Sequence, residues 1–161
     1  MSRTGHSYIK SKIIETNALL GGEMSGHIFF NDDWYGFDDA IYSALRMIEV
    51  LSKHKLTSHE VFDSYPKHFS TPEINLKVPE EDKFKIIDDL KTSIDSSVYE
   101  LIDIDGIRLE NKNSWGLVRA SNTSPNLVLR FEGKTESDLL EIKNYFKDIL
   151  SKIEIDLKLD F

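Results

Sequence analysis

The fold of this chain is decided by residues 107–133, which read IRLENKNSWGLVRASNTSPNLVLRFEG. Three runs in this stretch, 107–110, 115–120 and 127–131, are rich in leucine, β-branched and aromatic residues, as strands are. The polar segments between them are short, and short connections join antiparallel strands, whereas a parallel crossover needs a dozen or more residues. We therefore expect an antiparallel sheet in which consecutive strands lie side by side.

Further strands adjoin this stretch on its N-terminal side. Residues 74–78 alternate between apolar and polar side chains, as a half-buried strand does. Asp105-Gly106 is the strongest short-range hairpin signal of the chain, and it predicts that 99–104 pairs with 107–110. The predicted sheet is mainly antiparallel and has four to five strands.

Two helices are expected on one face of this sheet. Pro79 and the acidic residues that follow it open the first helix, and Thr135 caps the second. The apolar positions that we expect to be buried are Phe84, Ile87, Leu90 and Ile94 in the first, and Leu139, Ile142, Phe146, Ile149 and Leu150 in the second. Helices packed on one face of an antiparallel sheet form an α+β domain.

The N-terminal part of the chain has a different pattern. A short helix over 7–16 and strands over 18–20 and 28–30 precede an amphipathic helix over 37–54, and a shorter helix follows over 57–65. The apolar residues of the long helix repeat at intervals of three and four, which predicts one buried face. The residues of that face are Phe37, Ile41, Ala44, Leu45, Ile48 and Leu51.

A domain boundary is expected near 66–71, where prolines punctuate the chain. The predicted domains are 1–66 and 67–161, and the predicted fold class is α/β followed by α+β. A length of 161 residues is enough for one domain or two small ones, and 40% apolar and 30% charged residues describe an ordinary globular protein.

Composition also excludes some classes of function. The net charge of −8 argues against a surface for nucleic acid or anionic membranes, which would need a basic stripe. The absence of cysteine excludes disulfides and thiolate chemistry. No apolar run approaches the roughly 18–20 residues that span a bilayer, and no signal peptide is recognisable, so we expect a cytoplasmic protein.

The first candidate site is the glycine-rich segment that leads into strand 28–30. Glu23, Ser25 and His27 alternate along it, and this set suits a polyol, because a carboxylate accepts two neighbouring hydroxyls while serine and histidine donate or accept. The glycines let a ligand approach the main chain. The alternative is an ordinary glycine-rich turn.

The second candidate site lies between two strands of the sheet. Arg119 is followed by Ser121, Asn122 and Thr123, and a guanidinium with loop hydroxyls and amides can bind a phosphate. The alternative is a polar β-turn beside a solvated arginine. Arg130 alternates away from its apolar neighbours, so we expect it to support the loop from the opposite face of the sheet.

His6 is a third candidate, because it stands at the start of a helix, where anions are favoured. No metal site is expected. The histidines have no ligand spacing, and the pair Asp103 and Asp105 lies in a hairpin without a third ligand.

Taken together, these residues resemble the α-D-phosphohexomutase family, and specifically its bacterial phosphomannomutase/phosphoglucomutase branch. The resemblance rests on five segments in the order of the family: TGHS at 4–7, GEMSGH at 22–27, GFDD at 36–39, WGLVRASNT at 115–123 and LVLRFE at 127–132. It covers essentially the whole chain.

The resemblance implies the end of domain 3 followed by domain 4 of a four-domain enzyme. The expected fold is a partial three-layer α/β domain, whose incomplete sheet leaves an apolar helix face exposed, and then a domain like the TATA-box-binding protein. Glu23 and Ser25 would hold sugar hydroxyls, and His6 and His27 would line the same cleft. The residues that match the phosphate-binding loop are Arg119, Ser121, Asn122 and Thr123.

The resemblance also implies what this sequence lacks. The family transfers phosphate between a phosphoserine and the 1- or 6-position of glucose or mannose phosphate with Mg²⁺, and neither its Ser-His-Asn nor its Asp-Gly-Asp-x-Asp loop occurs here. We therefore expect no catalytic residue, no cofactor and no turnover in this chain alone, and an upstream polypeptide as partner. The alternative function is a non-catalytic interaction module derived from such an enzyme.

Overall fold

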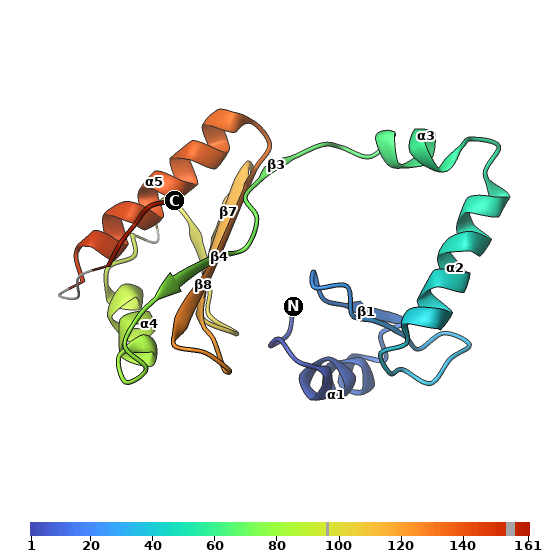
Figure 1. Ribbon diagram of the computed structural model, residues 1–161, viewed down its shortest axis with the longest axis horizontal. Coiled ribbons are helices and arrows are strands. Elements are labelled where there is room, and N and C mark those ends of the chain that lie inside the picture. Colours follow the sequence, from blue (N-terminus) through green and yellow to red (C-terminus); the bar gives the residue numbers. More distant parts are fainter. Residues whose placement is uncertain (96, 154–156) are drawn as a thin grey trace. The chain divides into compact units, whose positions relative to one another are not determined.

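The computed structural model describes residues 1–95, 97–153 and 157–161 (Figure 1). The chain divides into two units, Met1–Pro66 and Lys67–Phe161. None of the helices in the described ranges combines the length and the apolar character that a membrane span requires.

The C-terminal unit is built on an antiparallel sheet, as the sequence predicted. Its central strands are β6 (Ile107–Glu110), β7 (Ser114–Ala120) and β8 (Asn126–Gly133), and each pairs with the next. β5 (Glu100–Ile102) pairs with β6 in the predicted hairpin, whose turn uses Gly106 at a φ of 81°. A positive φ of this size favours glycine, which explains the signal in the sequence.

Two short strands complete this sheet along the remaining edge of β8. β3 (Phe69–Ser70) pairs with the end of β8, and β4 (Ile74–Lys77) pairs with its first half. The described sheet thus has six strands rather than the expected four to five. β3 was missed because two residues are too short to show any alternation.

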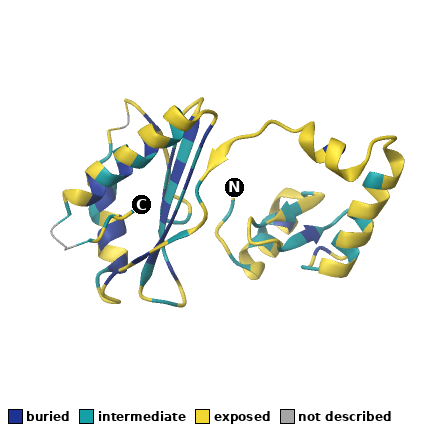
Figure 2. Ribbon diagram, turned by 45° about the horizontal axis from the view of Figure 1, so that its top comes forward, coloured by how far each residue is buried: buried dark blue, intermediate teal, exposed yellow. Residues whose placement is uncertain are grey.

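Helices α4 (Lys83–Thr92) and α5 (Glu136–Ser151) cover one face of the sheet (Figure 1). Thr135 caps α5 as predicted, and its side chain accepts a hydrogen bond from the Asp138 amide. Figure 2 shows the buried residues between these helices and the sheet. The core includes Ile86, Leu90, Ile107, Leu109, Val118, Leu127, Leu129, Phe131, Ile142, Phe146, Ile149 and Leu150.

The predicted face of α4 was wrong at one position. Phe84 is 57% exposed, whereas Ile86 is fully buried. The helix begins at Lys83, which is itself buried and pairs with Glu80, so the inward face runs through Lys83, Ile86, Ile87 and Leu90. Apolar residues flank this face on both sides, so the periodicity was compatible with burial of either Phe84 or Ile86.

Gly116 of β7 allows the sheet and α5 to approach closely. It pairs with Phe131 of β8 and faces Phe146 of α5, and the two rings form an edge contact with centroids 5.2 Å apart. A methyl group at Gly116 would lie 2.5 Å from Phe146 Cε2 and 2.8 Å from Phe131 Cδ1. Only glycine therefore fits beneath these rings without displacing them.

The N-terminal unit begins with α1 (His6–Thr16) and a hairpin of β1 (Leu20–Gly22) and β2 (Ile28–Phe30). β1 lies two residues later than the expected strand over 18–20. Ala18 and Leu19 instead present their carbonyls to Asn31, which caps the far end of the hairpin. The pair is antiparallel and is the one sheet among the described residues of this unit.

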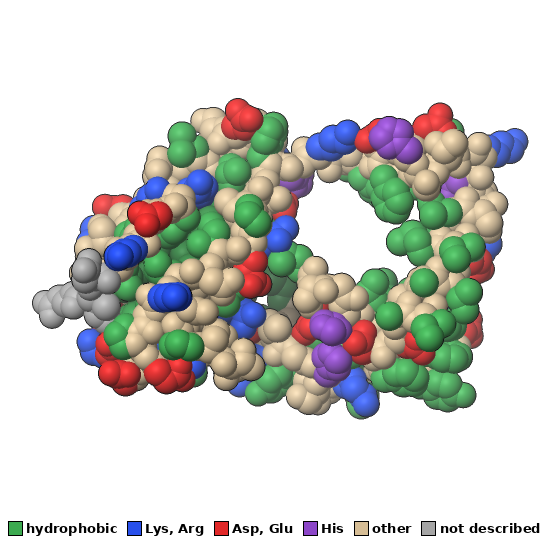
Figure 3. Space-filling view, in the orientation of Figure 1, with side chains coloured by type: hydrophobic (Ala, Val, Ile, Leu, Met, Phe, Trp, Pro, Cys, Tyr) green, Lys and Arg blue, Asp and Glu red, His purple; other side chains and the backbone are tan. Residues whose placement is uncertain are grey.

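The rest of this unit consists of α2 (Ala40–Lys53) and α3 (Ser58–Asp63). The periodicity predicted a buried face for α2, and this prediction was wrong, because α2 has no buried residue. Ile41, Leu45 and Ile48 are 77%, 59% and 62% exposed. Figures 2 and 3 show α2 as an exposed helix that carries hydrophobic side chains. The exposed apolar face that the family resemblance implied is thus confirmed.

We expect Gly116→Ala to lower the free energy of unfolding of the C-terminal unit by about 1–3 kcal/mol, because the added methyl overpacks the core. Urea titration followed at the amides of β7 and β8 measures this change. Gly22→Ala is the control, because its methyl would have its nearest contact at 3.7 Å. Equal midpoints for the two variants would contradict this account of the core.

Candidate functional site

The hairpin turn between β1 and β2 presents the first set of predicted residues. The Glu23 amide donates to the His27 carbonyl at 2.8 Å, and the Gly26 amide donates to the Glu23 carbonyl at 3.0 Å. Gly26 has a φ of 94°, which a side chain would strain. The alternation of carboxylate, hydroxyl and imidazole therefore sits on a tight, hydrogen-bonded turn.

Glu23 also ties this turn to the start of α1. Its Oε1 accepts a hydrogen bond from the Gly5 amide at 2.6 Å, while Oε2 accepts a longer one from the Ser25 hydroxyl at 3.4 Å. His6 is the first residue of α1, next to Gly5. The structure thus brings His6, Glu23, Ser25 and His27 together.

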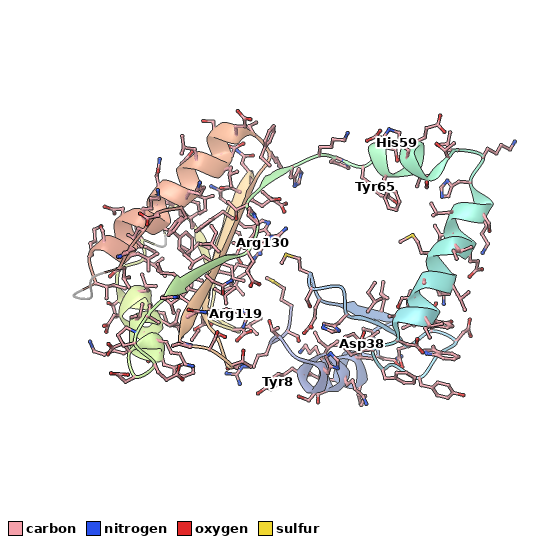
Figure 4. All side chains as sticks on the ribbon, viewed as in Figure 1. Tyr8, Asp38, His59, Tyr65, Arg119 and Arg130 are labelled. Carbon is pink, nitrogen blue, oxygen red and sulfur yellow. The ribbon has the colours of Figure 1, made fainter. Side chains whose placement is uncertain are left out.

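Asp38 completes this group, although sequence reasoning did not assign it to a site. Its Oδ2 lies 2.7 Å from His27 Nδ1 and 3.5 Å from His6 Nε2, and its Oδ1 accepts the Ile28 amide at 3.1 Å. The bond with His27 holds the pKa of the Asp38 carboxyl below its usual value, against the opposing effect of burial. Figure 4 shows Asp38 between the hairpin and the start of α2.

The helix predicted over 37–54 would contain Asp38 in its first turn. The structure corrects this: α2 begins at Ala40, and Asp39 is the N-cap that accepts the Tyr42 amide. Asp38 precedes the cap and bridges to Phe29 of β2, so its carboxylate turns toward the hairpin. The sequence signal that could have found it is its place in the segment GFDD.

Because a carboxylate only accepts hydrogen bonds, neutral His27 must donate to Asp38 from Nδ1. Nε2 is then the nitrogen that can meet a ligand. The His6 and His27 rings pack edge to face with centroids 4.6 Å apart, and His6 also packs on Phe29 at 5.5 Å. The two imidazoles are therefore positioned by packing as well as by Asp38.

The second predicted set lies in the turn between β7 and β8 of the other unit. Ser121 is buried, and its hydroxyl accepts hydrogen bonds from Ser124 Oγ at 2.9 Å and the Thr123 amide at 3.3 Å. The Ser121 amide donates to the Asn126 carbonyl at 2.9 Å. Asn122 and Thr123 are exposed at the tip. The buried Ser121 hydroxyl thus holds the loop in shape through hydrogen bonds to Thr123 and Ser124.

Arg119 and Arg130 flank this loop on one face of the sheet. Arg119 pairs in register with Val128, and Arg130 pairs with Leu117, so strand alternation puts both side chains opposite the helices. Arg130 therefore shares the face of Arg119 and does not support the loop from the other side as expected. Figure 4 shows both arginines on the side away from α4 and α5.

Within the part of the chain that the structure describes, Arg130 makes fewer polar contacts than its neighbour Arg108. Arg108 pairs with Glu110 at 2.7 Å and stacks over Trp115 at 4.1 Å. Among the described residues, by contrast, the buried Nε of Arg130 has no hydrogen-bond partner. An unsatisfied buried donor on this face favours an acceptor that comes from outside the chain.

Comparison with known proteins assigns both parts of the chain to one family. Residues 1–69 match "Phosphoglucomutase/phosphomannomutase, alpha/beta/alpha domain III", and residues 73–149 match "Phosphoglucomutase/phosphomannomutase, C-terminal domain". The whole chain is 51% identical to a phosphomannomutase/phosphoglucomutase of Pseudomonas putida and 49% identical to one of Pseudomonas aeruginosa. It covers 35% of the length of each.

A solved structure agrees with this assignment. The crystal structure of a phosphoglucomutase/phosphomannomutase family protein from Burkholderia thailandensis matches 96% of this chain with a TM-score of 0.85 and 40% identity. The match covers 33% of that protein. The chain thus spans about a third of the length of the relatives that it resembles.

We expect Asp38→Asn to change the tautomer of His27, because the amide no longer requires a proton on Nδ1. Two-bond ¹H–¹⁵N spectra of the imidazole should show the Nδ1–H form in the parent chain and a mixture in the variant. Asp39→Asn is the control, since asparagine caps a helix as well as aspartate. An unchanged His27 ring in Asp38→Asn would contradict the assigned role of Asp38.

Proposed function

We propose that this chain, which belongs to the phosphoglucomutase/phosphomannomutase family, supplies the sugar-hydroxyl and phosphate contacts of an enzyme that moves a phosphoryl group between the 1- and 6-positions of a hexose phosphate. The observation that carries the proposal is the clustering of His6, Glu23, Ser25 and His27 around one hairpin turn. We assign residues 1–66 to the end of domain 3 and residues 67–161 to domain 4.

In the N-terminal unit, we assign the sugar hydroxyls to Glu23 and Ser25. A carboxylate has about four lone-pair sites, and the Gly5 amide and the Ser25 hydroxyl leave acceptor capacity for neighbouring hydroxyls. His27, held through Nδ1 by Asp38, offers Nε2 to accept or return a hydroxyl proton. His6 lines the same group.

In the C-terminal unit, we assign the phosphate to Arg119 and the loop of Ser121, Asn122 and Thr123. A guanidinium binds a phosphate bidentately, and the second cation of Arg130 on the same sheet face adds to the attraction. The buried Ser121 hydroxyl fixes the shape of the loop, which supports a preformed anion site rather than a solvated turn.

Magnesium does not fit the residues that this chain supplies. Mg²⁺ prefers six oxygen ligands, whereas the group at the hairpin offers two imidazoles and one carboxylate. Within the described residues, Asp103 lies 3.5 Å from Lys91, which disfavours a cation there. We therefore place the Mg²⁺ and the phosphoserine of the complete enzyme in another part of it.

The exposed apolar face of α2 supports a partner for this chain. Ile41, Leu45 and Ile48 lie on a helix that belongs to a domain of layered α/β/α type, in which helices pack on a sheet. We propose that a polypeptide with the earlier domains covers this face, in the cytoplasm where we expect the enzyme to act. A stand-alone interaction module would also use this face, and the ligand titration below separates the two.

Titration of ¹⁵N-labelled chain with glucose 6-phosphate or mannose 1-phosphate should perturb the amides of residues 119–123. Arg119→Ala should weaken this response at least tenfold, because a charge-assisted bond contributes about 1.5–3 kcal/mol. Lys112→Ala, a change of the same charge at an exposed site of the same unit, should leave it unchanged. No response of the parent chain at saturating ligand would contradict the proposal and favour the module.

The purified chain should not interconvert hexose 1- and 6-phosphates by itself in the presence of Mg²⁺. Positioning alone cannot transfer a phosphoryl group without a donor and an ion. A coupled assay for glucose 6-phosphate measures this, with a full-length relative as positive control. Turnover by the 161-residue chain alone would show that the assignment of its role is wrong.

A further inference from the structure

One group of side chains in the N-terminal unit could bind more than sugar hydroxyls. It consists of His6, Glu23 and His27. One ligand atom of each lies within 4.8 Å of the other two, and the three residues come from the start of α1 and from the β1–β2 turn. No residue spacing in the sequence revealed this group, because His6 and Glu23 are brought together by the hydrogen bond from the Gly5 amide.

Two imidazoles and a carboxylate are the ligand set of a borderline transition-metal ion. Zn²⁺ takes this set with three protein ligands and keeps a fourth position open for water. The ligand atoms of such a tetrahedral site lie about 3.3–3.6 Å apart for bonds of about 2.0–2.2 Å. His6 and His27 have side chains that are 55% and 44% exposed, so both rings have room to close the remaining gap.

Asp38 supplies the outer contact that zinc histidines usually have. Metal-ligating histidines donate their second ring N–H to a carboxylate, which fixes the tautomer and raises the basicity of the ligand. His27 Nδ1 meets Asp38 Oδ2 at 2.7 Å, which leaves Nε2 for the metal, and His6 lies beside the same oxygen at 3.5 Å. The negative charge of Asp38 also favours a cation here.

We propose that His6, Glu23 and His27 form a binding site for a divalent transition-metal ion, with Zn²⁺ as the ion of choice and Asp38 as the positioning residue. The site shares its side chains with the proposed sugar contacts, so bound zinc would occupy the place of the sugar hydroxyls. The inference does not rest on the proposed function, because zinc binding is measured without any sugar.

Equilibrium dialysis of the full chain against Zn²⁺ tests this, with ¹H–¹⁵N spectra of the histidine rings as a second readout. We expect one zinc per chain, with shifts at His6 and His27. His27→Gln and Glu23→Gln should each lower the affinity at least tenfold. His59→Gln is the matched control, because His59 lies 3.0 Å from a carboxylate of Asp63 but outside the group.

Asp38→Asn should weaken zinc binding about 10–100-fold, as loss of an outer carboxylate does, while Asp39→Asn should not. Backbone amide spectra of every variant show whether it is folded. The proposal is overturned if the folded parent chain takes up no zinc, if His59→Gln loses as much affinity as His27→Gln, or if Mg²⁺ binds the group as tightly as Zn²⁺.

Discussion

The carboxylate of Asp38 is the contact on which the N-terminal site depends. It accepts a hydrogen bond from the His27 ring and another from the Ile28 amide, and it lies beside His6. His6 lies at the start of α1, His27 lies in the β1–β2 turn and Ile28 is the first residue of β2, so one side chain joins segments that are distant along the chain. A neutral histidine without such a partner can adopt either tautomer, and its ring can rotate. Proton transfer or ligand binding at one particular nitrogen requires a single tautomer and a single ring orientation. The same contact therefore underlies both the sugar contacts and the zinc site that we propose.

The C-terminal site depends instead on the alternation of a strand. Because α4 and α5 cover one face of the sheet, the side chains of β7 and β8 that point the other way remain available, and these include Arg119 and Arg130. Gly116 lets the covered face pack closely beneath two aromatic rings. A tight core thus fixes the strands, and the strands fix the spacing of the cations. Ser121 follows β7 directly and is buried, and its hydroxyl accepts a hydrogen bond from Ser124, which fixes the shape of the loop.

Local patterns in the sequence predicted the strands and helices well, because each depends on neighbours along the chain. The hairpin at Gly106 and the cap at Thr135 are of this kind. The predictions that failed concerned features that depend on contacts between segments distant along the chain. Asp38 could not be assigned to the site without knowing where α2 begins, and periodicity could not tell that α2 stays exposed in this chain. The sequence did not reveal the group of His6, Glu23 and His27 for the same reason. A hydrogen bond from the Gly5 amide to the Glu23 side chain brings its members together.

We propose that the N-terminal unit contacts the sugar hydroxyls of a hexose phosphate and that the C-terminal unit contacts its phosphate. The most direct test of this proposal compares amide shifts of the labelled chain with inorganic phosphate and with glucose 6-phosphate. The account predicts that phosphate alone perturbs residues 119–123 and leaves residues 23–27 unchanged, whereas the sugar phosphate perturbs both segments. Shifts at 23–27 with phosphate alone, or none at 23–27 with the sugar phosphate, would contradict it.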